Sequence, residues 1–296
     1  MKNKLFLSLR KATIPLTGKG LGKIPGIVLC YKFIYKIIKP KGIILIDVQG
    51  IKMYVDCRDK GVTPFLLTKG VYEKYETALF KELIKPGMVV IDIGANIGYY
   101  SLIAAKLLGS KGKVYAFEPE PRNYNLLVKN VKINSYNNII PIQKAVSNKQ
   151  GKAKLFTDKD NLGNPSFSED NISEKEGVVD VTTVTLDKFF ENLATYNNIF
   201  LFKIDAQGAE GLILEGAENL LKNNNLIIIM EFWPYGLKNL GTNPKKLLNK
   251  LYEYGFIIKH IDEQNQCLKL IDIEKLIDIC QSAKQGKASA NILLEK

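Results

Sequence analysis

Residues 88–98 have the sequence Met-Val-Val-Ile-Asp-Ile-Gly-Ala-Asn-Ile-Gly, and an uncapped apolar run at 99–108 follows directly. The apolar residues at 88–93 are typical of a strand that is buried on both faces of a sheet. The glycines allow a tight turn, and the run at 99–108 has the length and pattern of a helix. A buried strand, a glycine-rich turn and a helix in succession predict the first βα unit of a Rossmann-like α/β sheet.

The rest of the chain continues this alternation. Helices of ten or more residues separated by short apolar strands indicate parallel βαβ units. We therefore predict a mostly parallel, seven-stranded sheet. Its further strands are expected at 113–117, 139–145, 200–204, 226–232, 256–261 and 290–294, and its further helices at 73–85, 122–134, 209–221 and 244–254.

Two regions depart from the alternation. Residues 1–71 form a predicted N-terminal extension, with a hairpin around Gly50 and an amphipathic helix at 24–38. This helix is expected to dock on the main domain at 72–296, and a peripheral contact with a membrane surface is the alternative. A polar insertion at 147–180, bracketed by strands at 152–156 and 178–183, is either a substrate lid or a flexible loop.

Composition excludes several classes of protein. The 296-residue chain has a formal net charge of +12, but Arg10, Arg58 and Arg122 are its only arginines. Surfaces that bind phosphates usually use arginine, so we predict no specific nucleic-acid partner. Lysines interrupt the longest apolar stretch and the N-terminus lacks a signal-peptide pattern, which predicts a cytoplasmic protein. The four cysteines are widely spaced, and we expect neither a zinc site nor disulfides.

The glycine-rich turn differs from a dinucleotide-binding turn. Its spacing is G-x-N-x-G, with Asn96 near the place of the glycine that admits a pyrophosphate. Asp92 ends the first strand, where a carboxylate would repel a pyrophosphate but suits an ammonium group. Glu118 ends the next strand, where an acid binds both ribose hydroxyls. A nucleoside with an amino-acid tail and no phosphate fits this pattern, so S-adenosyl-L-methionine is the predicted cofactor. The alternative is a structural turn with incidental acids.

Three stretches carry a family resemblance: Val90–Ser101, Val114–Pro121 and Phe202–Glu210. They resemble the FkbM methyltransferases, and the likeness extends from about Tyr72 to Phe232. This resemblance implies a seven-stranded methyltransferase fold and a small-molecule or glycan acceptor methylated on a hydroxyl group, often of a sugar or macrolide. The family commonly has Glu where this chain has Gln207. With the turn, the resemblance gives the predicted cofactor-binding residues Asp92, Gly94, Ala95, Asn96, Gly98, Glu118 and Pro119.

The candidate catalytic residues lie at two later strand ends. Asp205 and Glu231 are the predicted general bases, because ligands bind at the carboxyl ends of parallel strands. Lys203 shares a face with Asp205, so the two side chains are expected to pair. A purely structural role in bracing the sheet is the alternative. His260, the only histidine, lies inside a late strand and is expected to be structural.

Rival functions remain open from the residues alone. A nicotinamide-dependent dehydrogenase shares the fold, although Asp92 and Asn96 argue against it. A nucleic-acid or protein N-methyltransferase is the other rival, but the chain lacks an Asn/Asp-Pro-Pro-Tyr motif after its fourth strand. We predict no metal requirement, because no third carboxylate accompanies Asp205 and Glu231.

Overall fold

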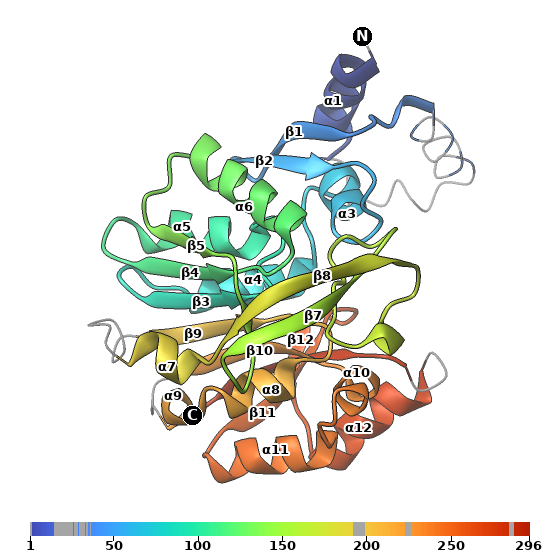
Figure 1. Ribbon diagram of the computed structural model, residues 1–296. Helices are drawn as coiled ribbons and strands as arrows, with labels where there is room; N and C mark the ends of the chain where they lie inside the picture. The colour runs from blue at the N-terminus through green and yellow to red at the C-terminus, as the bar shows by residue number, and fades with distance from the viewer. Residues whose placement is uncertain are drawn as a thin grey trace. The chain divides into compact units, whose positions relative to one another are not determined.

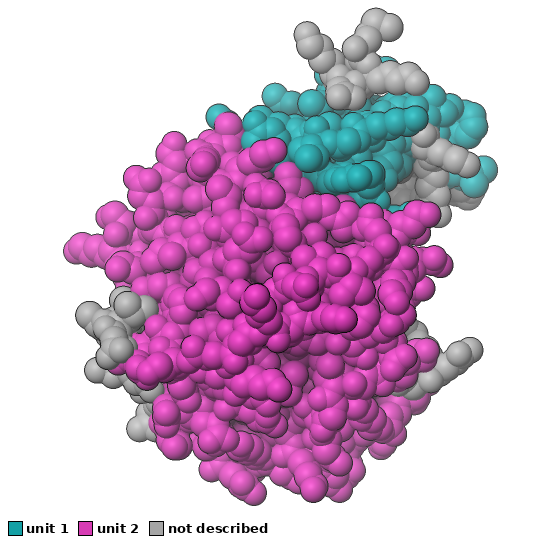
Figure 2. Space-filling view, viewed as in Figure 1, with its two compact units in different colours: residues 1–72 teal, residues 73–296 magenta. Residues whose placement is uncertain are grey.

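The computed structural model describes residues 2–14, 37–191, 199–222, 226–283 and 287–296, together with Gly26, Leu29, Phe33 and Tyr35. The chain divides into two compact units, Met1–Tyr72 and Glu73–Lys296 (Figure 2). Most of the helix that we predicted at 24–38 lies outside the described residues. Among the helices that are described, none is long and apolar enough to cross a membrane.

The first unit contains the predicted hairpin. Its strands pair antiparallel around Gln49 and Gly50, whose φ values of 55° and 76° are both positive, as a tight two-residue hairpin turn requires. A helix at Lys2–Thr13, which we did not predict, also belongs to this unit. Arg10 of this helix donates a hydrogen bond to the carbonyl of Leu66 at 2.9 Å. The elements are α1 (Lys2–Thr13), β1 (Ile43–Val48), β2 (Ile51–Asp56) and α3 (Thr63–Thr68).

The second unit is built on one large sheet with the strand order β12-β11-β13-β10-β9-β3-β4-β5 (Figure 1). The seven predicted strands are present, and a short eighth strand, β12, extends one edge. Strands β10, β9, β3, β4 and β5 run parallel, whereas β13 is antiparallel to both of its neighbours. The strands are β3 (Val89–Ile93), β4 (Lys113–Phe117), β5 (Ile139–Ile142), β9 (Ile199–Ile204), β10 (Ile227–Phe232), β11 (Ile257–Asp262), β12 (Cys267–Leu270) and β13 (Ala290–Glu295).

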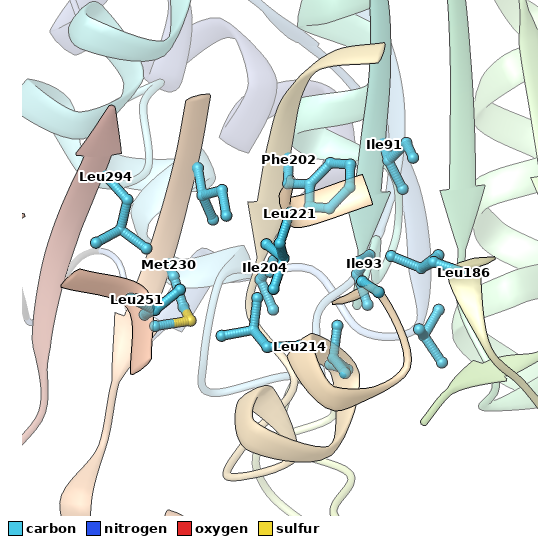
Figure 3. Packing of buried hydrophobic residues seen from close by; sticks show 14 of the residues in the cluster. Ile91, Ile93, Leu186, Phe202, Ile204, Leu214, Leu221, Met230, Leu251 and Leu294 are labelled. Atoms are coloured by element: carbon cyan, nitrogen blue, oxygen red, sulfur yellow. The ribbon is translucent and has the colours of Figure 1, made fainter. Parts of the chain in front are cut away.

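Helices cover both faces of this sheet. On one face, Ile91, Phe202 and Met230 pack with apolar residues of α7, α8, α9, α11 and α12 in a continuous core (Figure 3). Helix α5 packs against β3 and β4, and α4 packs against α5 and β11. The helices are α4 (Lys74–Leu83), α5 (Tyr99–Leu108), α6 (Pro121–Ile133), α7 (Leu186–Phe190), α8 (Glu210–Glu215), α9 (Glu218–Leu221), α10 (Pro234–Asn239), α11 (Pro244–Glu253) and α12 (Ile273–Ser282).

The prediction of a single helix at 209–221 is wrong, because this segment forms two helices, α8 and α9, with a break at Gly216. A β-carbon at Gly216 would lie 2.2 Å from the carbonyl oxygen of Ser147. The carbonyl of Gly216 also accepts a hydrogen bond from the backbone amide of Asp187 at 3.0 Å. Backbone contacts from elsewhere in the chain therefore interrupt a sequence that is locally suited to one helix.

The strands of the polar insertion, β7 and β8, join the short strand β6 directly before the insertion in a separate three-stranded sheet, ordered β6-β8-β7. Both strands that we predicted here are confirmed, and they pair antiparallel around a loop. Asp158 organises the base of this loop, since its two carboxylate oxygens accept hydrogen bonds from four backbone amides at 2.9–3.2 Å. The elements are β6 (Ala145–Val146), β7 (Gly151–Asp158), the 3-10 turn η3 (Glu169–Asn171) and β8 (Lys175–Val184).

Candidate active site

The glycine-rich turn lies against the end of the neighbouring strand β9. Gly94 has a φ of 77°, and a β-carbon there would lie 1.9 Å from the carbonyl oxygen of Asp205. Gly98, with a φ of 91°, precedes α5 and leaves room for the side chain of Leu127. Gly94 thus allows the β3 turn to approach the β9 end closely, and Gly98 allows α6 to approach the start of α5. The turn therefore brings the ends of two predicted site strands together.

Glu118 follows β4, and its carboxyl group contacts the glycine-rich turn after β3. Its side chain is 2% exposed and accepts hydrogen bonds from the backbone amides of Asn96 at 2.7 Å and Glu120 at 2.9 Å. Burial raises the pKa of Glu118 to about 8, although the two backbone hydrogen bonds oppose this rise. The amides of Gly94 and Ala95 both donate to the carbonyl of Phe117. The G-x-N segment is thus wrapped around the end of β4.

Asp92 is buried behind this turn, with 2% exposure. One of its oxygens accepts a hydrogen bond from the Ser101 hydroxyl of α5 at 2.5 Å. Burial raises the pKa of Asp92 to about 6, and the Ser101 hydrogen bond lowers it. This contact ties the end of β3 to the helix that follows it.

A cavity lies at the carboxyl ends of β3, β4 and β9. Of the predicted site residues, Gly94, Glu118, Pro119 and Asp205 line it. Asp92, Ala95, Asn96, Gly98, Lys203 and Glu231 are not among its lining residues. The insertion supplies much of the remaining wall, with Leu155, Gly163, Pro165, Ser166 and Phe167. The insertion therefore covers the cavity on the side opposite the sheet edge.

Lys203 does not form the ion pair with Asp205 that we predicted. Its ammonium group lies 3.0 Å from Glu76 of α4 and 4.9 Å from the centre of the Tyr100 ring. Lys203 and Glu76 are 1% and 0% exposed. Burial lowers the pKa of Lys203, but the carboxylates of Glu76, Asp205 and Glu73 raise it above its usual range. The prediction failed because the closest carboxylate comes from a helix distant in sequence.

Glu73 and Tyr100 extend this buried group of charges. The Tyr100 hydroxyl lies 3.0 Å from a Glu73 oxygen and 2.8 Å from Glu76. Because a hydroxyl has one hydrogen, it can donate to only one of them at a time. Burial, followed by the charge of Glu76, raises the pKa of Glu73 to about 8. A protonated Glu73 that donates to Tyr100 satisfies both contacts.

The two predicted bases lie on neighbouring strand ends and share a donor. The amide nitrogen of Gln207 donates to Asp205 at 2.6 Å and to Glu231 at 3.3 Å. Burial, then the charges of Asp205 and Glu210, raise the pKa of Glu231 well above its usual range. Glu210 begins α8 and accepts from the amides of Ala206 at 3.0 Å and Gly208 at 3.2 Å, so it holds the loop that carries Gln207.

Aromatic side chains follow Glu231 at the same edge of the sheet. The rings of Trp233 and Tyr235 have centroids 5.8 Å apart. The Trp233 indole donates to the carbonyl of Lys287 at 3.0 Å, and the Lys287 ammonium lies 4.7 Å from the centre of the Tyr235 ring. Aromatic rings that follow Glu231 in the sequence therefore lie beside a lysine that is distant in the sequence.

The sequence analysis did not predict that several of these residues belong to the site. Tyr72 and Glu73 matched the family, but nothing in the sequence joined Glu73 to Tyr100 or to Asn291, which donates to it at 3.1 Å. The contacts of Ser166 and Asn171 with the site were missed as well. Their only signal was the polar composition of the insertion. His260 is half-buried in β11, and burial is the main cause of its lowered pKa.

The described part of the chain has no cluster of three or more His, Cys, Asp or Glu side chains that could hold a metal ion. Asp205 and Glu231 lie together, and an amide group occupies the place beside them at which a third carboxylate would be needed. Oxygen-rich sites for magnesium or calcium normally use several such ligands. Beside Asp205 and Glu231, the described residues therefore place the hydrogen-bond donor of Gln207.

The chain is similar to known methyltransferases. A profile of the methyltransferase FkbM domain matches residues 92–258. The chain is 27% identical over 168 residues to the hexuronic acid methyltransferase AglP of Haloferax volcanii, covering 56% of this chain and 62% of that protein. It is 51% identical over 51 residues to the ribosomal RNA large subunit methyltransferase E of Acinetobacter baumannii, covering 17% of this chain and 21% of that protein.

The chain thus spans less than two-thirds of the length of these curated relatives. Among solved structures, the methyltransferase FkbM from Methylobacillus flagellatus has a TM-score of 0.42 and 14% identity, covering 79% of this chain and 52% of that one. A TM-score in this range supports no conclusion, so the classification rests on the family profile and the strand order. The chain belongs to the FkbM methyltransferase family, and its second unit carries the methyltransferase FkbM domain at residues 92–258.

Proposed function

We propose that this protein transfers a methyl group from S-adenosyl-L-methionine to a hydroxyl group of a sugar or a similar polyhydroxylated metabolite. The observation that carries the proposal is the cavity that Gly94, Glu118 and Asp205 line together at the carboxyl edge of the sheet. Ligands of open α/β sheets bind at this edge, where the strand order reverses. In this sheet the reversal lies between β3 and β9.

The residues fit the cofactor. Each oxygen of Glu118 accepts one backbone hydrogen bond, which leaves each oxygen free for one further hydrogen bond with a ribose hydroxyl. Pro119 and the insertion residues Leu155 and Phe167 give the same cavity apolar walls for a base. Asp205 lines the cavity as a further acid, which suits a cationic sulfonium and its amino-acid tail. Asp92 supports the site from behind through Ser101.

When bound, S-adenosyl-L-methionine supplies a methyl group that is already activated for transfer. The protein's own task is to align the acceptor hydroxyl, exclude water and accept the hydroxyl proton. Asp205 is the better placed base, because it lines the cavity. Burial, followed by the charge of Asp205, raises the pKa of Glu231 well above its usual range, which makes it the less favourable proton acceptor of the two. Lys203 and Glu76 keep the buried charge behind the site balanced.

A sugar acceptor is supported from two sides. AglP of Haloferax volcanii is a hexuronic acid methyltransferase by name, and it is 27% identical to this chain over 168 residues. Trp233, Tyr235 and Lys287 lie at the acceptor edge. Flat rings suit the C–H face of a sugar, and a lysine suits an acidic substituent.

The test is a transfer assay with a ¹³C-methyl donor. The acceptors are a glucuronic acid glycoside, the matching neutral glucoside, ribosomal RNA and a lysine-rich protein. We expect a new methoxy carbon signal on one of the sugars, stronger for the acidic one. Label on RNA, or on a protein nitrogen, with none on either sugar would overturn the proposed acceptor class.

A further inference from the structure

Gln207 makes an unusual set of contacts. It follows β9 in the left-handed region, with a φ of 51°. Its amide nitrogen donates to Asp205 Oδ1 at 2.6 Å and to Glu231 Oε2 at 3.3 Å. An amide nitrogen has two hydrogens, whereas an ionised carboxylate has none to donate. A glutamine can therefore bridge two carboxylates from neighbouring strands, and a glutamate in its place cannot.

The backbone of the same residue is held by the insertion. The Gln207 carbonyl accepts hydrogen bonds from the Ser166 hydroxyl at 2.8 Å and from the Asn171 amide at 3.0 Å. Both partners are buried, with 1% and 4% exposure. Asn171 is itself oriented, because its side-chain oxygen accepts from Asn239 at 2.7 Å. Gly208 leaves the room for this contact, since a β-carbon there would lie 2.6 Å from the Asn171 amide nitrogen.

The surroundings of Glu231 are strongly acidic. Asp205, Glu210 and Glu73 raise its pKa in addition to burial, and a hydrogen bond from Ser289 lowers it. Burial, followed by the charge of Glu231, raises the pKa of the Cys280 thiol to about 12. The amide of Gln207 adds two donors here without adding a charge. A carboxylate at position 207 would add a further negative charge between two that already repel each other.

We propose that Gln207 is a positioning residue: its amide holds Asp205 and Glu231 as one hydrogen-bonded pair, and its carbonyl ties this pair to the insertion that covers the cavity. This role rests on the proposed function, in which Asp205 and Glu231 handle the acceptor proton. The insertion thereby contributes to the geometry of the reaction as well as to the cavity wall.

The test compares Gln207→Glu, Gln207→Met and the matched control Gln266→Glu. Gln266 has the same left-handed conformation, with a φ of 52°, in the exposed turn between β11 and β12. The first readout is the titration of Glu231 by carboxyl-carbon NMR, with its signal assigned by loss in Glu231→Gln. The second is the pH profile of turnover on the acidic sugar. Methionine matches glutamine in length but has no N–H donors.

We expect Glu231 to titrate at higher pH by about one unit or more in Gln207→Glu, by less in Gln207→Met, and unchanged in Gln266→Glu. The turnover profile of Gln207→Glu should move the same way, with activity about tenfold lower at pH 7 and regained as the pH rises further. A purely structural defect would lower turnover at every pH.

An unshifted Glu231 titration in both Gln207 variants would overturn the positioning role. The titration needs no acceptor, so this failure is distinct from failure of the proposed function. In that second case the wild-type protein methylates neither sugar, although Glu231 titrates as described.

Discussion

Gly94 and Gly87 share a left-handed backbone, with φ values of 77° and 86°, but differ in their surroundings. A β-carbon at Gly94 would lie 1.9 Å from the Asp205 carbonyl oxygen, whereas one at Gly87 would have no atom within 4 Å. Alanine at either position meets a backbone cost of about 1–2 kcal/mol. We predict that Gly87→Ala loses only this amount in urea unfolding, and that Gly94→Ala loses more and no longer binds the donor. Equal losses in both variants would contradict the close approach of β3 and β9.

Single substitutions can separate the contributions of Asp205 and Glu231 to turnover. Removal of a general base lowers turnover by about 10²–10⁴-fold. We predict a loss of this size in Asp205→Asn and a smaller one in Glu231→Gln, with donor affinity measured separately by calorimetry. Near-full turnover in both variants would show that the reaction proceeds by alignment alone.

At the scale of elements, local pattern was sufficient for most of the sheet. The apolar runs that form β3, β4 and β10 were found because each is buried on both faces, which leaves a continuous hydrophobic signature. The edge strand β12 has two exposed residues among four and gave no such signature. The break between α8 and α9 was also missed, because its cause is the Ser147 carbonyl beside Gly216. Contacts of that kind are not encoded in a local window of sequence.

The insertion gives the prediction that belongs to this scale. Asn171 is buried and joins the insertion loop to Gln207 and to α10. Its replacement by alanine leaves buried partners unsatisfied, which costs about 1–3 kcal/mol. We predict lower stability in urea together with weaker donor binding for Asn171→Ala. The exposed Asn249 of α11 is the control, and its alanine variant should change neither. Unchanged donor binding in a destabilised Asn171→Ala would limit the insertion to a structural role.

The buried acids of the second unit have a joint effect on the whole molecule. Burial raises the pKa of Glu73 and Glu118 from 4.5 to about 8, and that of Glu210 to about 7. When the folded-state pKa is the higher one, the folded protein binds more protons, so stability is present below about pH 4.5 and is lost as pH rises through about 8. We predict a falling urea midpoint between pH 5 and pH 9 without donor, and a shallower fall in Glu118→Gln. An identical pH dependence in that variant would contradict a protonated Glu118.

Only part of the site could be predicted from the sequence. Its motifs located Gly94, Glu118 and Asp205, because glycine spacing and strand ends are local features. The group of Glu73, Glu76, Tyr100 and Lys203 joins α4, α5 and β9, and only the packed domain brings these side chains together. The expected Lys203–Asp205 pair failed for the same reason. Side-chain pairing depends on which helix covers the strand, whereas the position of the cavity depends on the sheet alone.

Calorimetric titration of the full chain with S-adenosyl-L-methionine and, separately, with NAD tests the central claim most directly. The account predicts saturable binding of S-adenosyl-L-methionine and none of NAD. It also predicts about tenfold weaker binding in Glu118→Ala, because the variant loses two hydrogen bonds to the ribose that contribute about 0.5–1.5 kcal/mol each. Glu253→Ala, which removes an exposed carboxylate of α11, should bind as the wild type does. Binding of NAD in place of S-adenosyl-L-methionine, or unchanged affinity in a folded Glu118→Ala protein, would contradict it.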